Sequence, residues 1–402
     1  MKKYFLAVAS FFIYSHISLG QVYPGQMDST FVPVRSHHYD PELTFDFCVN
    51  EPAWNNQAGI HSAFGSTDRL YFRKEVPVNH NNDLSSSYST TVWRGERANA
   101  QILVWSSEAL EQVRVSTQDL RSAEGNIIPK DRITFELVRY VLSNYPYAEK
   151  KAICGESPYK SGFLMPDRFE TLDRFDLPSQ TTRPVWMMVD VPRGTVPGTY
   201  KGQVEVRAKG KAPQLLNLEI VVQNQLLPYP KDWKYRLDLW QNPWAVAWYN
   251  HVEPWSPEHK MLLKQHLKHY ADAGGTYITT YGVHSPWSDN SYMIEGGMIE
   301  WIKKADGTWA FDYKIFDEYV ELAMECGIDE AITLYTPIPW GFRHRYKDEA
   351  TGDYSYINWA PSSEEFKKMW NIFLTDFKFH LEAKSWLDIT YIGINENPME
   401  ET

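Results

Sequence analysis

Apolar and polar residues alternate with a period of two over much of the first half of the chain, and this pattern predicts β-strands. The clearest case is a hairpin in which Tyr200, Val204 and Val206 alternate with polar residues and residues 216–222 alternate on the return. Further strands are predicted at residues 91–93, 101–105, 113–115, 135–142 and 185–191. Such short strands, each with one apolar face, predict an antiparallel β-sandwich. The aperiodic stretch 143–182 is expected to be an ordered excursion over its surface.

After Pro228 the pattern changes to strands and helices in alternation. Strands are predicted at residues 235–240, 276–281 and 331–335 and in a buried apolar run from Ile389 to Ile394. Between them lie three amphipathic helices, the first capped by Ser256 and the third by a Ser362–Glu365 capping box. A hairpin with its turn at residues 306–307 is predicted in a long insertion before the second helix.

Four such steps build parallel strands with right-handed crossovers, which continue either as a doubly wound sheet or as an eight-stranded barrel. No glycine-rich phosphate loop follows the first strand, so the (β/α)8 TIM-type barrel is favoured. We therefore expect a multidomain β then α/β chain: a signal peptide (1–20), an N-terminal β-sandwich (21–228) and a catalytic barrel domain (233–402). Only about four β/α units of that barrel are present, so we expect the chain alone to associate through its last strand and to be inactive.

Composition and charge narrow the class of ligand. A net charge of −11 leaves no basic surface for nucleic acid or for an anionic membrane. Aromatic residues are 15% of the chain, and their flat faces suit stacking on sugar rings as well as core packing. The first twenty residues have the charged start, apolar stretch and small-residue end of a secretory signal, and no later stretch is long enough to span a membrane. We therefore expect an exported protein, periplasmic or secreted.

The three cysteines give no sign of metal chemistry, because their spacing matches no zinc site. Cys326 is expected to be a buried side chain on a helix, and Cys48 and Cys154 are either a disulfide or free thiols. No metal or organic cofactor is predicted.

The carboxyl ends of parallel strands meet at one edge, where α/β enzymes place their chemistry. The candidate binding residues there are Trp240, His284, Trp287, Tyr335 and Trp340, and the fourth strand ends at Asn395 and Glu396. Each has a plainer interpretation: the tryptophans as packing, His284 as a hydrogen-bonded wall residue and Glu396 as an ordinary loop carboxylate.

Several short motifs in order resemble glycoside hydrolase family 123, among them 93–96 (WRGE), 198–202 (GTYKG), 237–243 (LDLWQNP), 306–309 (DGTW) and 395–398 (NENP). The resemblance implies an exported bacterial β-N-acetylgalactosaminidase with a β-sandwich, a (β/α)8 barrel and a retaining, substrate-assisted mechanism. It makes Glu396 the general acid/base. It places at position 395 an aspartate that stabilises the substrate's acetamido group, but this chain has asparagine there, and Asn397 departs from a frequent arginine.

Three functions follow from these observations. The first is a β-N-acetylgalactosaminidase-like exo-hydrolase acting on a glycan with a terminal N-acetylhexosamine, impaired by truncation and by Asn395. The second is a non-catalytic carbohydrate-binding relative. The third, an exported structural β-sandwich with a vestigial α/β tail, gives the aromatic strand ends no purpose.

Overall fold

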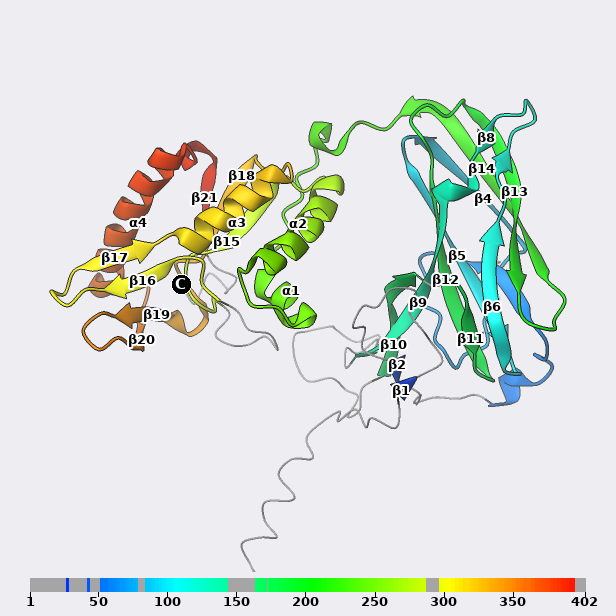
Figure 1. Cartoon of the computed structure of the whole chain (residues 1–402), viewed down its shortest axis with the longest axis horizontal. Coiled ribbons are helices and arrows are strands. Elements are labelled where there is room, and N and C mark those ends of the chain that lie inside the picture. Colours follow the sequence, from blue (N-terminus) through cyan, green and yellow to red (C-terminus); the bar gives the residue numbers. More distant parts are fainter. Residues whose placement is uncertain are drawn as a thin grey trace, which may run out of the picture. The chain divides into compact units, whose positions relative to one another are not determined.

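The computed structural model describes residues 51–78, 84–143, 163–171, 173–286 and 296–394, together with a short strand pair, β1 (Met27–Asp28) with β2 (Glu42–Leu43). The chain divides into two compact units, residues 1–227 and 228–402 (Figure 1). The N-terminal unit is built of β-strands, whereas helices and strands alternate in the C-terminal unit.

Two facing sheets form the described part of the N-terminal unit (Figure 1). One sheet has the order β10 (Phe163–Thr171), β9 (Ile133–Ser143), β12 (Thr181–Asp190), β5 (Arg97–Ser106), β3 (His61–Gly65). The other has the order β11 (Phe175–Leu177), β6 (Leu110–Thr117), β13 (Gly198–Arg207), β14 (Gln214–Leu226), β4 (Ser87–Arg94), with β7 (Leu120–Arg121) and β8 (Ile127–Ile128) beside β13. The inward residues of both sheets make one apolar core.

All seven strands predicted in this unit are present, because period-two alternation is a strong signal when one face of a sheet is buried. The stretch 143–182, expected to be an ordered excursion over the surface, contributes the strands β10 and β11 to the two sheets, and its residues 144–162 and 172 lie outside the described part. The predicted sandwich is also not wholly antiparallel, because in the second sheet β4 pairs with β14 in parallel.

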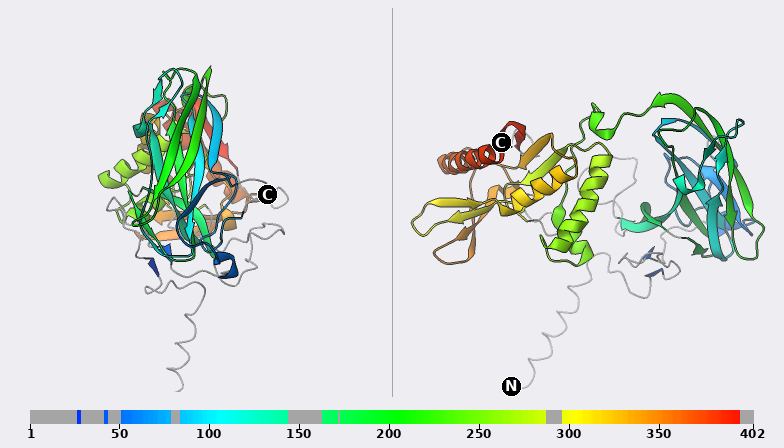
Figure 2. Two further views of the ribbon diagram at one scale, coloured as in Figure 1. Left: turned by 90° about the vertical axis from the view of Figure 1, so that its right-hand side faces the viewer. Right: turned by 45° about the horizontal axis from the view of Figure 1, so that its top comes forward.

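A parallel sheet lies at the centre of the C-terminal unit, in the order β15 (Tyr277–Tyr281), β18 (Ala331–Tyr335), β21 (Thr390–Gly393). α2 (Pro257–Asp272) precedes β15, α3 (Lys314–Glu325) lies between β15 and β18, and α4 (Glu364–Lys384) lies between β18 and β21. α2 and α3 lie side by side (Figures 1 and 2). Ser256 caps α2, and its side chain accepts from the backbone N–H of His259 at 3.2 Å.

Three expectations for this unit are corrected. Residues 235–240 do not form a strand, and only Leu237 bridges to Gly275. Ser363 rather than Ser362 caps α4, because its hydroxyl accepts from the N–H of Phe366 at 3.1 Å. The apolar residues of the last strand are not buried: Tyr391 is 57% and Ile392 40% exposed, since β21 pairs within the described residues only with β18.

A second sheet is inserted into this unit, in the order β17 (Trp309–Asp312), β16 (Glu300–Lys303), β19 (Arg343–Asp348), β20 (Tyr354–Asn358). The β16–β17 hairpin, turning near residues 304–308, was predicted, whereas β19–β20 was not. The first hairpin follows β15 and the second follows β18, and β16 joins β19 in parallel. Two separate connections therefore form one inserted sheet, seen beside α4 in Figure 2.

Aromatic side chains dominate the core of the C-terminal unit. One face of the inserted sheet buries Trp301, whose ring lies 4.7 Å from that of Phe373 and 5.5 Å from that of Trp370 on α4. Cys326, at the end of α3, is buried with a free thiol, and burial raises its pKa. Within the described residues, none of the helices combines the length and the apolar character that a bilayer span requires.

Candidate active site

The carboxyl ends of the three parallel strands lie in register. Tyr281 of β15 is the partner of Tyr335 of β18, and Tyr335 is the partner of Gly393 of β21. Ile394 follows, and its carbonyl accepts a hydrogen bond from the Thr336 hydroxyl. Asn395 and Glu396 are the next residues of the chain and lie outside the described residues, as does Trp287. The structure therefore brings the chain to this edge two residues before the predicted acid.

Two of the predicted binding residues meet at this edge. The Trp240 ring lies 4.9 Å from the Tyr335 ring, inclined by 39°. Tyr335 is 1% exposed, whereas 47% of Trp240 is exposed. Trp240 therefore offers apolar surface to solvent at this edge, and such a surface suits contact with the apolar C–H groups of a pyranose.

The other two predicted residues, His284 and Trp340, lie on the loops after β15 and β18. The backbone N–H of Trp340 donates to the Pro286 carbonyl at 2.8 Å, so the two loops are joined. Gly282 is tied to Tyr335 in the same way, its N–H donating to the Tyr335 carbonyl at 2.7 Å. His284 is half-buried. All four described candidates therefore belong to one edge of the sheet.

A second aromatic group supports this edge from the side of α1 (Pro243–Asn250), a helix that begins at the Asn242 cap. Trp244 is stacked on Tyr281 with ring centroids 5.6 Å apart, and its ring meets that of Trp255 edge-on at 5.4 Å. His259 holds the two tryptophan segments together: its Nδ1 accepts from the Trp255 N–H at 2.8 Å, and its Nε2 donates to the Pro243 carbonyl at 2.9 Å. Burial lowers the pKa of His259, so it is a neutral structural residue.

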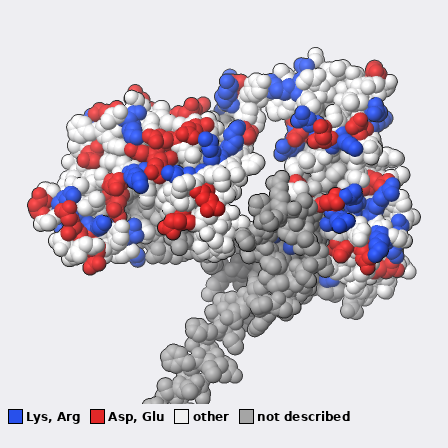
Figure 3. Space-filling view, in the orientation of Figure 1, with Lys and Arg blue, Asp and Glu red and all other residues white. Residues whose placement is uncertain are grey.

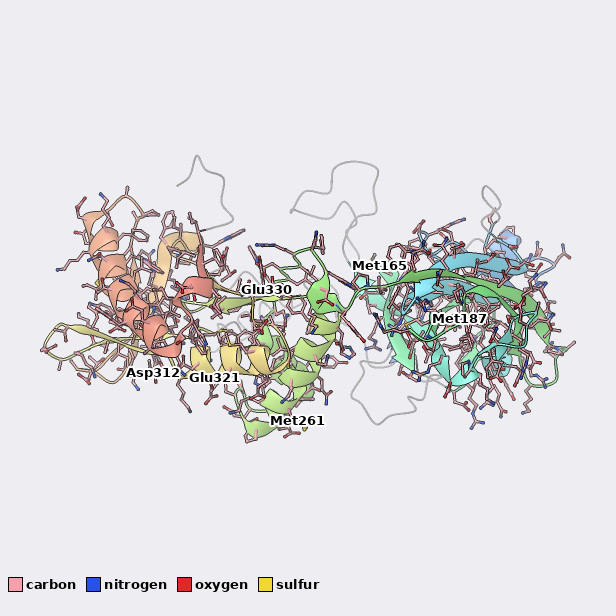
Figure 4. The ribbon with its side chains drawn as sticks, turned by 90° about the horizontal axis from the view of Figure 1, so that it is seen from above. Met165, Met187, Met261, Asp312, Glu321 and Glu330 are labelled. Carbon is pink, nitrogen blue, oxygen red and sulfur yellow. The ribbon has the colours of Figure 1, made fainter. Side chains whose placement is uncertain are left out.

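A cavity of about 520 Å³ adjoins this edge. It reaches His284 and Trp244 on one side and the inserted sheet on the other, where Glu300, Asp312 and Arg345 line it. Asp312 ends β17 immediately before α3, as Figure 4 shows. The volume is within the range of about 300–1,000 Å³ that small-molecule sites occupy.

The sequence did not single out these cavity residues. One usable signal is the alternation of Arg343, Arg345 and Lys347 opposite Tyr354 and Tyr356, which predicts a hairpin with one polar, aromatic face. The helix α1 also had a signal that was not used, an Asn-Pro pair that caps a helix and presets its first turn. Among the described residues, no group of three or more His, Cys, Asp or Glu side chains is placed to hold a metal.

A β-sandwich followed along the chain by a parallel sheet with helices before and between its strands defines a multidomain β then α/β protein. Two family models narrow this: the catalytic domain of glycoside hydrolase 123 matches residues 240–402, and the glycoside hydrolase 123 N-terminal domain matches residues 64–208. The chain belongs to glycoside hydrolase family 123.

A solved structure agrees with this assignment. It is a family 123 glycoside hydrolase from Clostridium perfringens, described in a study of glycolipid glycan hydrolysis, with 26% identity and a TM-score of 0.76. The match covers 86% of this chain and 59% of that one, so this chain spans about three fifths of the solved enzyme. No protein with a curated description matches the sequence.

Two other solved structures resemble this chain too weakly to support a conclusion about its fold or function. A PapD-like domain of human CEP192 is 14% identical with a TM-score of 0.21, covering 35% of this chain and 82% of that one. A xyloglucanase from Bacteroides ovatus is 10% identical with a TM-score of 0.17, covering 77% of this chain and 43% of that one.

Proposed function

We propose that the chain is the sandwich and the first part of the barrel of an exported glycoside hydrolase that releases terminal β-linked N-acetylgalactosamine. The observation that carries the proposal is the contact of Trp240 with Tyr335 at the edge where three parallel strands end in register. The chain approaches this edge at Ile394, two residues before Glu396. In the proposed complete domain, this edge forms part of the carboxyl-terminal face of a (β/α)8 barrel.

The proposed mechanism retains the anomeric configuration. The carboxylic acid of Glu396 protonates the glycosidic oxygen while the acetamido oxygen of the substrate attacks the anomeric carbon, and the bond to the leaving sugar breaks. A water molecule then attacks the anomeric carbon and opens the ring of the oxazolinium intermediate, while the Glu396 carboxylate takes a proton from that water. A group at position 395 accepts a hydrogen bond from the acetamido nitrogen. An aspartate there also offsets the positive charge of the intermediate, which the amide of Asn395 cannot do.

The experiment measures hydrolysis of 4-methylumbelliferyl β-N-acetylgalactosaminide by protein expressed from the complete reading frame that contains this chain. We expect slow turnover, complete loss in Glu396→Gln, and a gain of about a hundred- to a thousandfold in Asn395→Asp, which restores the charged partner. A thiazoline analogue of the intermediate should inhibit. Turnover that persists in Glu396→Gln would reject this assignment of the acid/base.

Asn395 also favours a second function, a carbohydrate-binding relative without catalysis. In that case the parent protein binds N-acetylgalactosamine with no detectable turnover. Asn395→Asp creates turnover only if the remaining machinery is intact. Export is tested separately: the secretory signal predicts that the mature protein starts at Gln21, which amino-terminal sequencing measures.

A further inference from the structure

The N-terminal sandwich carries apolar side chains on the outer face of one of its sheets. In β12, Val185, Met187 and Val189 belong to the core between the two sheets. Side chains of a strand alternate between its two faces, so Trp186 and Met188 lie on the face that turns away from this core, and both are partly exposed. The solvent face of an antiparallel strand is usually polar, which makes a tryptophan and a methionine there informative.

Phe169 of β10 joins Trp186 across the strand that lies between them. Their ring centroids are 5.6 Å apart and the rings are inclined by 31°. The register places both rings on one face, because Trp186 is opposite Glu136 of β9 and Phe169 is opposite Val138, two residues further along β9. Phe169 is nevertheless 46% exposed. The two rings therefore form one apolar surface that is open to solvent.

Hydrogen bonds hold polar groups on both sides of this surface. On β5, Asn99 Oδ1 accepts from the Trp186 indole N–H at 3.2 Å, which fixes the indole plane and leaves the Asn99 amide nitrogen as a donor. On β10, the Thr171 hydroxyl donates to Glu136 Oε1 at 3.1 Å, and its oxygen can still accept. Because these groups are already oriented, less conformational entropy is lost when a ligand binds.

An ion pair borders the same surface. Arg97 and Asp190 are opposite each other on β5 and β12, their side chains meet at 2.6 Å, and about half of each is exposed. Arg97 Nη1 also lies 3.7 Å from Met188 Sδ. On the face of the sandwich that Figure 3 shows, acidic and basic side chains are interspersed. Such an arrangement favours a neutral ligand, because an ion is attracted by an excess of one sign of charge.

Aromatic surface beside neutral donors and acceptors suits a sugar, whose ring has apolar C–H groups on its face and hydroxyls at its edge. The catalytic domain of this chain is that of a glycoside hydrolase, so a glycan is the ligand class that the protein meets. We propose that the N-terminal unit binds a neutral glycan chain on a patch formed by Trp186, Phe169, Met188, Asn99 and Thr171. A long or multiply displayed glycan held there has a raised effective concentration at the enzyme.

The test follows binding at the patch itself. Protein expressed from the complete reading frame that contains this chain is labelled with ¹³C at its methionine methyl groups, and Glu396→Gln prevents turnover. A neutral tetrasaccharide that ends in β-N-acetylgalactosamine, titrated to about 10 mM, should shift the Met188 methyl resonance in a saturable way. The resonances of Met187, buried in the core, and Met261, 58% exposed in the other unit, should not move (Figure 4). An unmoved Met188 resonance would overturn the proposal.

A variant and a matched control test the aromatic surface. Phe169→Ala should raise the dissociation constant read from the Met188 resonance about tenfold, because it removes one of the two stacking rings at a half-exposed position. The control is Trp93→Ala, at an aromatic residue that is 41% exposed in β4 of the other sheet, and it should leave the dissociation constant unchanged. Equal weakening in the two variants would contradict a site at the patch.

Two comparisons separate this site from the proposed catalysis. On 4-methylumbelliferyl β-N-acetylgalactosaminide, kcat/KM of Phe169→Ala should match that of the parent within about twofold, since the patch uses no residue of the C-terminal unit. A parallel loss of turnover would refute a separate site, whereas a shift of Met188 in a protein without turnover supports the patch and rejects only the catalysis. A sulfated tetrasaccharide that binds more tightly than the neutral one would refute the assignment of a neutral ligand.

Discussion

His344 should make the C-terminal unit less stable in mildly acidic solution. It is 2% exposed in β19 and lies among three tryptophan rings, with centroids at 4.8 Å for Trp359, 5.9 Å for Trp301 and 6.0 Å for Trp370. Its Nδ1 donates to the Phe342 carbonyl at 3.1 Å, and its Nε2 accepts from the Trp370 indole N–H at 3.4 Å. Both bonds fit a neutral imidazole, and a proton on Nε2 would remove the second.

The magnitude follows from the pKa. Burial lowers the pKa of His344 to about 4, although hydrogen bonds to the Phe342 and Pro337 backbones oppose part of this shift. In the unfolded chain the pKa is about 6.5, so between these values the unfolded state binds more protons and stability falls as pH falls. Stability from this residue is fully present above about pH 6.5. At pH 5 about 2 kcal/mol of it is lost relative to pH 7.5.

Urea unfolding at pH 7.5 and pH 5.0 measures this loss. Tryptophan fluorescence reports mainly on the C-terminal unit, because twelve of the sixteen tryptophans lie in residues 228–402. In His344→Asn the unfolding free energy should fall at both pH values, but its difference between them should be about 2 kcal/mol smaller than in the parent protein.

The control for this prediction is His251→Asn, at an exposed position of the same unit, which should leave the parent's pH dependence intact. If His344→Asn and the parent protein lose the same free energy between pH 7.5 and pH 5.0, the assignment of a buried neutral histidine is refuted.

Two further predictions concern the same unit. Tyr313→Phe removes the hydrogen bond that the Tyr313 hydroxyl donates to Asp376 Oδ1 at 2.7 Å. Because the acceptor is charged, the free energy of unfolding in urea should fall by about 1.5–3 kcal/mol. An unchanged unfolding midpoint would contradict this prediction. Ile392→Lys places a charge on the exposed face of β21 and should reduce concentration-dependent association in light scattering of this chain, whereas an unaltered association constant would show that another surface is responsible.

How far the sequence predicts this fold depends on what each pattern reports. Alternation along residues 198–207 and 214–226 predicts a hairpin because one face of each strand is buried in the unit's own core. The run from Ile389 to Ile394 reads as buried for the same reason, yet Ile394 is 64% exposed, because hydrophobicity reports what a strand can bury and not which partner covers it.

The candidate site likewise has one part that the sequence predicts and one part that it does not. The rule that parallel strands present their carboxyl ends at one edge places Tyr335 correctly, and the Trp240 ring does meet it, although residues 235–240 form no strand and only Leu237 bridges to the sheet. The pairing of Glu300 with Arg345 and Tyr354 in one cavity could not be predicted, because it depends on the parallel contact between β16 and β19, which come from connections about forty residues apart. Local patterns carry no information on such long-range pairing.

Because two hairpins share the inserted sheet, related chains cannot change the residues of one hairpin independently of the other. A loop that stands alone can be lengthened or exchanged without disturbing its neighbours, whereas the hairpins β16–β17 and β19–β20 pair with each other through β16 and β19 and bury Trp301 against α4. A deletion in either hairpin would therefore unravel the other. We expect recombination between homologues to succeed when both hairpins are exchanged as a pair and to fail when one is moved by itself.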